Sequence, residues 1–589
     1  MNKNTIIELT EFGILPNTNI DYTKQLNKIF NNSESNITYR FSPGTYCFFA
    51  KNGEKSEYAM SNTEPIPKRT LSIWIKDKQN ITIEGNGAEF IYYGHVQPIT
   101  LDNCKNIQLK NFTIDWEKPL VAEGTIVAKT SDYLDVCINQ QLFPCYVHNF
   151  CLYFDIGDGE TSQLTYGAHT IYKSATLTVA QNSADIIMIK NAEHIGNDIF
   201  RLYTSGILKE NQSPSVNDIL VLRHNQRHHA GIFAEHCSNL IYNNIKIHSC
   251  GGIGMLFQFC SDVTCQNLSF IPNNKIGRKI SCTRDDGMQI SNCRGHFITE
   301  GCTFHGLQDS PINIHGTSVY VKKFITNRII ECKYINKYAH GFKYLAEPGD
   351  ELKFLNRNNM SEIERATVLS CHATKNGHFV LEFTEPISEN LIKMQTKEIA
   401  IENMTNSPSV TIRYNHFGSC RSRGILVTTL KPVIIEENYF ESAGSAILIS
   451  GDVNFWNEVG SCRNVIIRRN IFTDACNIAP YEYCYAMITI YPVIPKPQKN
   501  INYHSNILIE DNTFSSPDTP ILYAFSVKNL TVRQNKVFRS NRFINHNTEK
   551  SLFHIKNCDE TILTDNILIG TFSLNENKTE NCTLIERTK

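Results

Sequence analysis

The chain has 589 residues, a formal net charge of −1 and 41% apolar residues. The near-neutral charge, without a long basic run, argues against nucleic acid or an anionic membrane surface as a partner. No run of about 18 apolar residues occurs, so we expect no membrane insertion. About 150 residues per domain would predict three or four domains, but repetitive β folds are longer as single units.

The first residues contain no apolar segment of the kind found in signal peptides. Either the protein is cytoplasmic, or it is periplasmic or secreted and its signal peptide has been removed. We expect the second.

The 20 cysteines occur singly within apolar segments, as at Cys104 and Cys260, and not in CxxC pairs. We interpret them as small hydrophobic residues buried in a core. Their spacing fits no zinc site. Disulfides and metal sites are the alternatives for these cysteines. We expect no metal and no cofactor.

Residues 21–30 carry apolar side chains at helical spacing, namely Leu26, Ile29 and Phe30. This spacing predicts a short amphipathic helix. Such a helix is suited to cap the open end of a solenoid, whose terminal unit must cover its apolar surface.

A repeated pattern begins near residue 71: Asn or another polar residue, alternating apolar residues, then Asn or Gly. It recurs from residues 80, 106, 239, 262, 409, 432, 464, 506 and 529, and several intervals are 23 residues. Short strands at this period predict an all-β protein built as a parallel β-helix, in which stacked coils share one core. We expect the Asn after each strand to adopt a left-handed conformation and to pair with the Asn of the next coil.

Two regions interrupt the repeat with longer alternating segments, which predict small inserted antiparallel β-barrels. The predicted organisation is an N-terminal cap with the first coils (1–117), an inserted barrel (118–205), central coils with an active-site wall (206–317), a second inserted barrel (318–405) and C-terminal coils (406–589).

Acidic residues concentrate in two polar clusters of the central coils. Asp286 and Asp309 are 23 positions apart, so with Asp262 they are predicted to form a row of one carboxylate per coil, about 4.8 Å apart. Like charges this close repel, which is unfavourable unless function requires it. Glycoside hydrolysis requires a pair of carboxylates. The alternative, aspartates that bond local backbone amides at turns, applies above all to Asp262 and Asp285.

Asp309 is surrounded by further polar residues, Gln308, Asn313 and His315. The alternation from Ile312 onwards directs Asn313 and His315 to the same, polar face of the strand. We interpret this cluster as a site for sugar hydroxyls, and His315 either takes part in it or is an ordinary surface histidine.

A second dense cluster contains Trp456 between Asp452 and Glu458. An aromatic ring beside carboxylates is suited to a sugar, whose apolar face packs on the ring. The alternative is a tryptophan that covers the core. Cations that could pair with the acidic residues are Arg223, Arg227, Arg421 and Arg423.

Seven motifs, in the same order, resemble the exo-α-1,3-galactosidases of glycoside hydrolase family 110. The resemblance extends from about residue 70 to residue 480 and rests on Asn111–Trp116, Arg227–Ile232, Gly252–Gln258, Arg278 with Asp285–Gly287, Asp309–Thr317, Arg423–Leu426 and Gly451–Glu458. It implies a right-handed β-helix with two inserted barrels. It also implies inverting, metal-free removal of terminal α-1,3-linked galactose, as on the blood group B antigen or on linear α-galactosyl glycans. A homodimer is the oligomer that the resemblance suggests.

By this resemblance, Asp286 and Asp309 occupy the acidic positions of the family, whereas Ser310 stands where family members carry a further Asp. The acid and base roles therefore stay open. The resemblance also implies a further catalytic Glu in the second barrel, for which Glu347 and Glu351 are the candidates. An inverting enzyme separates its carboxylates by about 6.5–9.5 Å, which exceeds the spacing of adjacent coils, so we expect one partner from outside the row, in keeping with a Glu of the barrel or of a loop. The candidate substrate-binding residues are Arg227, Gln258, Arg278, Asp285, Gln308, Asn313, His315, Asp452, Trp456 and Glu458.

Two other classes of function remain as alternatives. The first is another β-helix carbohydrate enzyme of the pectin hydrolase or lyase type. The ordered motifs of the pectin hydrolases are absent, and the neutral charge disfavours a lyase acting on an acidic polymer. The second is a non-catalytic glycan-binding solenoid that uses the same Trp456 and carboxylates.

Overall fold

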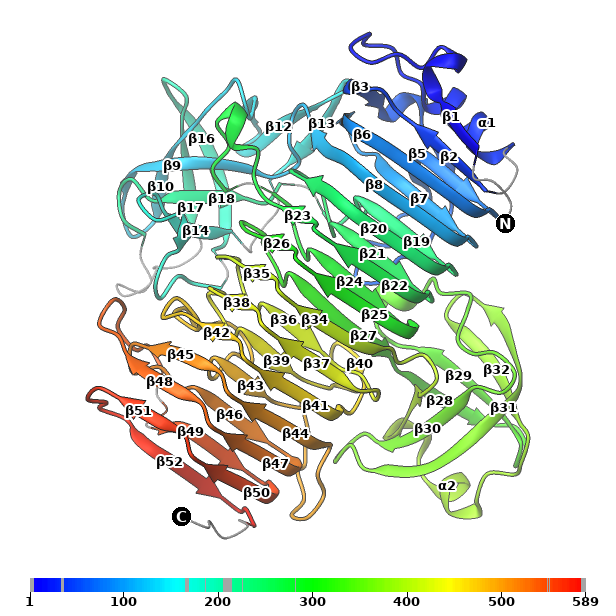
Figure 1. Ribbon diagram of the computed structural model, residues 1–589, viewed down its shortest axis with the longest axis vertical. Helices are drawn as coiled ribbons and strands as arrows, with labels where there is room; N and C mark the ends of the chain where they lie inside the picture. The colour runs from blue at the N-terminus through cyan, green and yellow to red at the C-terminus, as the bar shows by residue number, and fades with distance from the viewer. Residues whose placement is uncertain are drawn as a thin grey trace.

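The computed structural model describes residues 5–32, 36–164, 169–185, 187–204, 214–224, 226–280, 282–547, 549 and 551–583. It is the predicted parallel β-helix, in which two long parallel sheets of 22 and 14 strands run the length of the molecule (Figure 1). The fold class expected from the repeats is confirmed.

The 14-stranded sheet forms the wall on which the candidate site lies. Its strands are β4 (Glu54–Ser56), β5 (Arg69–Lys76), β7 (Gln97–Asp102), β19 (Ile232–Glu235), β21 (Met255–Gln258), β24 (Met288–Ser291), β27 (Ile312–Thr317), β36 (Ile425–Val427), β39 (Ile447–Ile449), β43 (Ile488–Ile490), β46 (Leu522–Phe525), β49 (Ser551–Lys556) and β52 (Asn575–Glu580), with β40 (Glu458–Val459) paired to β27 beside it.

The 22-stranded sheet forms the rest of the coils. Its strands are β1 (Thr5–Glu8), β2 (Ile37–Arg40), β3 (Gly44–Phe49), β6 (Gln79–Tyr93), β8 (Lys105–Trp116), β20 (Ser238–Ile247), β22 (Ser261–Gln266), β23 (Ser269–Phe270), β25 (Arg294–Glu300), β26 (Thr303–Phe304), β34 (Ser409–Arg413), β35 (His416–Phe417), β37 (Val433–Glu436), β38 (Tyr439–Phe440), β41 (Arg463–Arg468), β42 (Ile471–Phe472), β44 (His504–Glu510), β45 (Thr513–Ser516), β47 (Val527–Arg533), β48 (Lys536–Arg539), β50 (Asp559–Thr564) and β51 (Ile567–Ile569).

The predicted N-terminal helix is present as α1 (Thr23–Asn31) and buries Leu26 and Phe30. The Asn27 side chain fixes it to β5, because its Nδ2 donates to the Ser72 carbonyl at 2.8 Å and its Oδ1 accepts from the Trp74 amide at 2.8 Å. The helix therefore covers the N-terminal end of the core.

The interior of the helix is a stack of like side chains. Neighbouring rings are 4.5–5.2 Å apart, centroid to centroid, along Phe270, Phe304, Phe417, Phe440, Phe472 and Phe514. All 20 cysteines are free, and 15 of them are buried. The interpretation of the cysteines as core residues is confirmed.

A ladder of asparagines, buried except for the half-buried Asn566, follows the strands of the C-terminal coils. Each Nδ2 donates to the next Oδ1 at 2.9–3.0 Å along Asn415, Asn438, Asn470, Asn512, Asn535 and Asn566. The predicted pairing is thus present. The left-handed residue at these corners is the one before each Asn, namely Tyr414, Glu437, Arg469, Asp511, Gln534 and Asp565. The ladder Asn lies inside the corner because its side chain bonds buried backbone carbonyls there, as Asn470 bonds Ile435.

Replacing Asn470 by Ala is expected to lower the free energy of unfolding by about 3 kcal/mol, because each buried partner left unsatisfied costs about 1–3 kcal/mol. Asn390→Ala is the control: Asn390 is exposed on helix α2 (Glu389–Lys393), where alanine is the better helix former. Urea denaturation of both variants measures the difference. Equal stability of the two variants would show that the ladder does not stabilise the coils.

The first insertion forms two antiparallel sheets. The seven-stranded sheet contains β9 (Ala122–Lys129), β10 (Tyr133–Ile138), β14 (Thr170–Lys173), β15 (Thr178–Val179), β16 (Ile189–Gly196), β17 (Ile199–Thr204) and β18 (Ile219–Leu222), and the three-stranded sheet contains β11 (Cys145–His148), β12 (Cys151–Gly157) and β13 (Glu160–Gln163). The strand order of the larger sheet is open, with β15 and β16 at its edges, which differs from the expected closed barrel. The insertion also continues to Leu222, beyond the expected boundary at residue 205, because β18 pairs with β9.

The second insertion is a closed barrel, as expected. Its strands are β28 (Val319–Phe324), β29 (Ile329–Tyr334), β32 (His378–Phe383), β31 (Glu362–Lys375), β30 (Glu351–Asn356) and β33 (Ile399–Asn403). Figure 1 shows the two insertions on opposite flanks of the coils, the first beside the N-terminal half.

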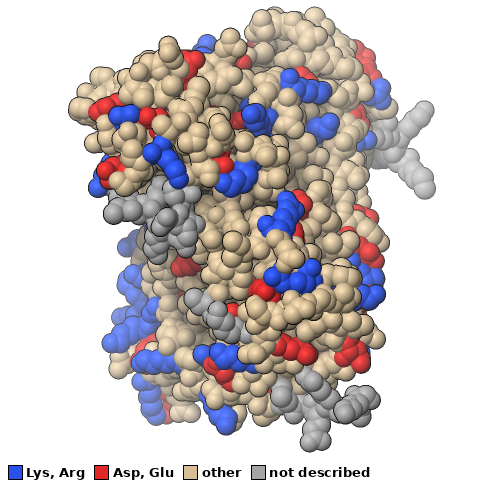
Figure 2. Space-filling model, turned by 90° about the vertical axis from the view of Figure 1, so that its left-hand side faces the viewer, with Lys and Arg blue, Asp and Glu red and all other residues tan. Residues whose placement is uncertain are grey.

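On the face drawn in Figure 2, basic and acidic side chains are interspersed among other residues. Within the described ranges, no helix is both long enough and apolar enough to cross a membrane.

Candidate functional site

The two acidic clusters lie on adjacent coils, immediately before β24 and β27. Met288 pairs with Ile312, so the interval between these coils is 24 residues and not the 23 of the repeat. The Gly287 amide donates to the Ser310 carbonyl at 3.1 Å, and a Cβ on Gly287 would lie 2.6 Å from the Pro311 carbonyl oxygen. The expected vertical alignment of Asp286 with Asp309 is therefore wrong by one position.

Asp262 does not belong to this row. It lies on β22 in the other sheet, and its Oδ1 accepts a hydrogen bond from the His296 amide at 3.0 Å. Asp262 is therefore a turn aspartate that bonds a backbone amide. It lies on the opposite wall of the coil from Asp286.

A cavity of about 280 Å³ opens at the wall between these coils. Six acidic residues line it: Asp185, Asp286, Asp309, Asp452, Glu458 and Glu482. Glu458 reaches the cavity because β40 folds back on β27, where Thr317 pairs with Glu458. The Asn62 side chain donates to Glu458 Oε1 at 2.9 Å and so fixes that carboxylate.

Asp309 faces three guanidinium groups. Its carboxylate lies 3.1 Å from Arg227 and 3.8 Å from each of Arg421 and Arg423. Burial alone would raise the pKa of Asp309, but the charges of Arg421, Arg227 and Arg423 outweigh it and hold the pKa below its usual value. Asp309 is therefore ionised at neutral pH.

Asp286 is in the opposite electrostatic environment. It is 3% exposed, and burial together with the negative charges of Asp309, Asp285 and Glu458 raises its pKa well above that of an ordinary carboxyl, against the opposing charge of Arg227. Asp286 is therefore the carboxyl group of this cavity that carries a proton.

Asp285 lies behind the cavity and organises the arginines. Its fully buried carboxylate pairs with Arg223, with Arg227 at 2.9 Å and with Arg284 at 3.0 Å. Burial would raise the pKa of Asp285, but the charges of Arg227, Arg284 and Arg223 lower it far below the usual range. Asp285 therefore orients Arg227 towards Asp309 and does not itself line the cavity.

The predicted cluster around Trp456 forms one rim of the cavity. Asp452 accepts hydrogen bonds from the backbone amides of residues 454–457, so its carboxylate holds the loop that carries Trp456. The Asn336 side chain of the second insertion donates to the Trp456 carbonyl at 2.6 Å. Trp456 is 37% exposed and lines the cavity.

Asn313 lines the cavity as expected from the alternation of β27. Its buried Oδ1 has no hydrogen-bond partner among the residues that the structure describes, and neither has Arg423 Nε. Buried polar atoms are normally paired. These two groups are therefore an acceptor and a donor available to a polar ligand.

Besides Asp285, four of the predicted binding residues lie behind the cavity wall. Arg278 is buried in an ion pair with Asp115. Gln308 donates to Tyr172 Oη at 3.3 Å and to the Gly306 carbonyl at 2.8 Å. These contacts are structural.

Gln258 and His315 are also behind the wall, but they contact the segments that line it. Gln258 Oε1 accepts from the Ser61 amide at 2.8 Å, next to Asn62. His315 Nε2 lies 2.9 Å from Gln289 Nε2 and 3.7 Å from Glu458 Oε1. Both residues position groups of the site.

The structure does not bring Glu347 and Glu351 to the cavity. Glu347 lies 3.5 Å from Arg294 with 58% of its side chain exposed, and Glu351 is exposed on β30 of the barrel. The barrel supports the rim through Asn336 and does not supply a carboxylate. The additional carboxylate that the sequence argument required from outside the row is present in the cavity as Glu458.

Sequence reasoning missed Asn62, Asp185 and Tyr483, which also line the cavity. They lie in irregular segments between strands, where no repeat predicts the position of a side chain. Asp185 pairs with Arg421, an interaction that joins the first insertion to the wall. Over the described part of the chain, no group of three or more His, Cys, Asp or Glu residues is arranged to hold a metal ion.

Comparison with known proteins adds close relatives. The chain is 35% identical over 570 residues to alpha-1,3-galactosidase B of Bacteroides thetaiotaomicron, covering 96% of this chain and 91% of that protein. It is 30% identical to alpha-1,3-galactosidase B of Phocaeicola vulgatus, with 93% of each chain covered. It is 27% identical to alpha-1,3-galactosidase B of Akkermansia muciniphila, with 98% and 72% covered. No family model matches the chain.

Solved structures show a more distant similarity. The family 28 exopolygalacturonase of Yersinia enterocolitica matches with a TM-score of 0.45 at 12% identity, covering 98% of this chain and 78% of that one. The relatives over the full length of the chain confirm the resemblance seen in its motifs.

Proposed function

The chain belongs to the alpha-1,3-galactosidase family, and we propose on that premise that it removes terminal α-1,3-linked galactose from glycans. One observation carries the proposal: a single cavity holds Asp286, which is kept protonated, beside Asp309, which is kept ionised. Two carboxyl groups whose pKa values are driven apart are the acid and base of glycoside hydrolysis.

In this proposal Asp286 is the general acid. It donates its proton to the glycosidic oxygen as the bond to the leaving group breaks. Asp309 is the general base, which accepts a proton from the water that attacks the anomeric carbon. Its negative charge also stabilises the positive charge that develops on the sugar ring.

In this proposal the reaction inverts the configuration at the anomeric carbon, as the resemblance to glycoside hydrolase family 110 implies. The one-position shift offsets Asp286 from Asp309 by about 3.3 Å along the strand, at right angles to the spacing of about 4.8 Å between coils. Two carboxyl groups on neighbouring coils are thereby further apart than in the vertical row that the sequence predicted. Glu458, across the cavity, is positioned to hold the attacking water or a sugar hydroxyl.

The cavity is suited to one sugar ring. Its volume of about 280 Å³ is at the lower end of the range of about 300–1,000 Å³ for ligand pockets. The guanidinium groups of Arg421 and Arg423 and the Oδ1 of Asn313 provide donors and an acceptor for its hydroxyls. The cavity therefore has room for a terminal galactose.

Galactose release from an α-1,3-linked galactosyl disaccharide, compared with the α-1,4- and α-1,6-linked isomers, tests the proposal. We expect release from the first alone. We also expect kcat/KM to fall as the pH rises through the elevated pKa of Asp286, since the acid is active only while protonated. A folded protein that releases galactose from none of the three would contradict the proposal.

Action on blood group B type or linear α-galactosyl glycans, a homodimer, and a periplasmic or secreted location stay predictions. The relatives support a glycan as the substrate, because they are named for an activity on α-1,3-linked galactose.

A further inference from the structure

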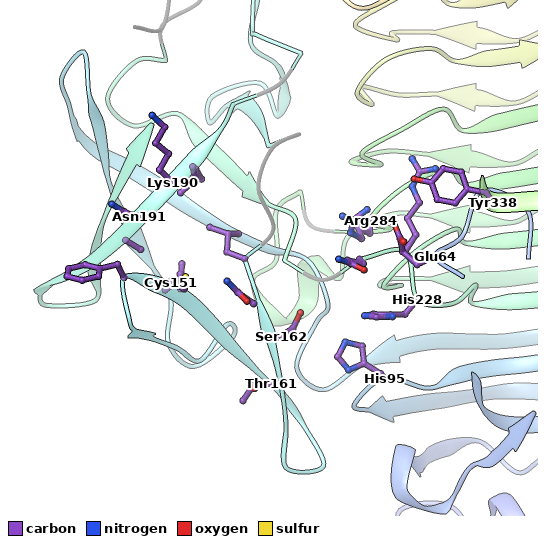
Figure 3. A pocket seen from close by; sticks show the side chains of 18 of the residues that line it. Glu64, His95, Cys151, Thr161, Ser162, Lys190, Asn191, His228, Arg284 and Tyr338 are labelled. Carbon is purple, nitrogen blue, oxygen red and sulfur yellow. The ribbon is translucent and has the colours of Figure 1, made fainter. Parts of the chain in front are cut away.

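A second, larger cleft lies between the coils and the first insertion (Figure 3). Its volume is about 860 Å³, compared with about 280 Å³ for the catalytic cavity. If the smaller cavity holds one sugar ring, the cleft has room for about three, since ligand pockets are filled closely.

The cleft adjoins the catalytic cavity. Arg227 and Trp456 line both of them, so the two hollows share the rim beside Asp309. When a terminal sugar occupies the small cavity, its glycosidic bond must lie at the opening of that cavity, and the rest of the glycan must continue outside it. The shared rim makes the cleft the space into which that remainder extends.

The cleft has two walls from different parts of the chain. Figure 3 shows His95, His228 and Arg284 on the side of the coils, facing Ser162 and Asn191 of the first insertion across the gap. The insertion contributes residues of β12, β13 and β16 to its wall. The second insertion adds Tyr338, from the short 3₁₀ helix Lys337–Ala339, at the rim.

The wall on the coil side is polar with little net charge. Arg227 and Arg284 share the carboxylate of Asp285, and the acidic side chain of Glu64 also lines the cleft. His95 lies 2.8 Å from Glu160. Burial lowers the pKa of His228 to about 4, so this imidazole is neutral at pH 7. Paired charges and neutral hydrogen-bonding groups suit hydroxyl and amide substituents better than an anionic ligand.

We propose that this cleft binds the leaving-group portion of the glycan, as two or more neutral sugar rings beyond the terminal galactose, and that the first insertion is the element that selects it. The proposal rests on the proposed function, because the cleft is assigned as the continuation of the catalytic cavity. It makes the insertion a determinant of substrate length and not only a cover for the coils.

Filling the cleft from the side of the insertion tests this. Asn191 on β16 and Thr161 on β13 are exposed and line the cleft, so Asn191→Trp and Thr161→Trp place a large ring in it at positions with few packing constraints. Ile195→Trp is the matched control, because Ile195 is 45% exposed on the same strand β16 and does not line the cleft.

Two substrates distinguish binding in the cleft from binding in the catalytic cavity. One is an α-galactoside of nitrophenol, and the other is a tetrasaccharide with galactose α-1,3-linked to a neutral trisaccharide. We expect each cleft variant to raise KM for the tetrasaccharide about tenfold, corresponding to about 1.4 kcal/mol of binding, and to leave kcat/KM for the nitrophenyl galactoside unchanged. The control should match the wild type on both. Variants that affect both substrates equally, or neither, would overturn the proposal.

Calorimetric titration with the neutral trisaccharide alone measures binding to the cleft independently of catalysis. We expect binding to the wild type and to Ile195→Trp, and a Kd weakened about tenfold or more in Asn191→Trp and Thr161→Trp. If the wild type binds the trisaccharide but releases no galactose from either substrate, the proposed function fails while the cleft assignment stands. If it releases galactose but binds no trisaccharide, the cleft assignment fails alone.

Discussion

Replacing Asp309 by Asn is expected to lower kcat/KM for galactose release by about 10²–10⁴-fold, the usual contribution of a positioned acid or base. The midpoint of thermal unfolding should change little, because Arg227 keeps its partner Asp285 and Arg421 keeps Asp185. Asp511→Asn is the control, since Asp511 is an exposed corner residue far from the cavity. Wild-type activity in the Asp309 variant would refute its catalytic role.

Azide distinguishes the two roles of the carboxyl pair. If Asp309 is the base, azide can attack in place of the activated water when a small residue replaces it, so Asp309→Gly should regain activity in azide and form a β-galactosyl azide. Asp286→Gly should not be rescued on a substrate with a poor leaving group, because it lacks the acid. Rescue of Asp286→Gly and not of Asp309→Gly would reverse the assignment.

Replacing Asp285 by Asn is expected to destabilise the protein by about 3–5 kcal/mol, the cost of leaving buried charges without their partner. Asp285 is fully buried and pairs with Arg223, Arg227 and Arg284. Urea denaturation measures the loss, and the same exposed control, Asp511→Asn, should lose less than about 0.5 kcal/mol.

Activity should fall with Asp285→Asn as well, because Arg227 would lose the anion that holds it beside Asp309. If the variant proves as stable as the wild type, the three arginines are stabilised by something other than Asp285. The model of a buried charge cluster behind the wall would then be wrong.

The coils were predictable from the sequence because their constraints are local and repeated. An Asn at each corner and apolar residues in alternation recur in every coil, so the strands around residues 80, 239 and 506 were placed correctly. The second barrel was recognised for the same reason: long alternating strands have a period that differs from the coils.

The register of the site was not predictable. The interval between paired strands is 23 residues from β20 to β22 but 24 from β24 to β27, since loops between strands vary in length. One residue is enough to place Asp286 in register with Ser310 and not with Asp309. Because of the same variation in loop length, the repeat predicted Asp262 on the wall of Asp286, whereas it lies in the other sheet.

The sequence showed which charged residues are available to the site, but not which of them pair with one another. Arg227, Arg421 and Arg423 were identified as cations for the acidic clusters, but the sequence does not show which carboxylate they surround. Glu458 was assigned to binding because it lies beside Trp456, and Glu347 and Glu351 were assigned to catalysis by the family resemblance. Their positions depend on how a loop pairs with β27 and on how the barrel is oriented, and these are long-range contacts with no local signal.

The configuration of the sugar released first tests the account most directly. Proton NMR of the wild-type reaction on an α-1,3-linked galactosyl disaccharide, recorded before mutarotation, should show β-galactose first, since the water attacks from the face opposite the leaving group. The appearance of α-galactose first, or of no galactose at all, would contradict the assignment of Asp286 and Asp309 as the acid and base of an inverting galactosidase.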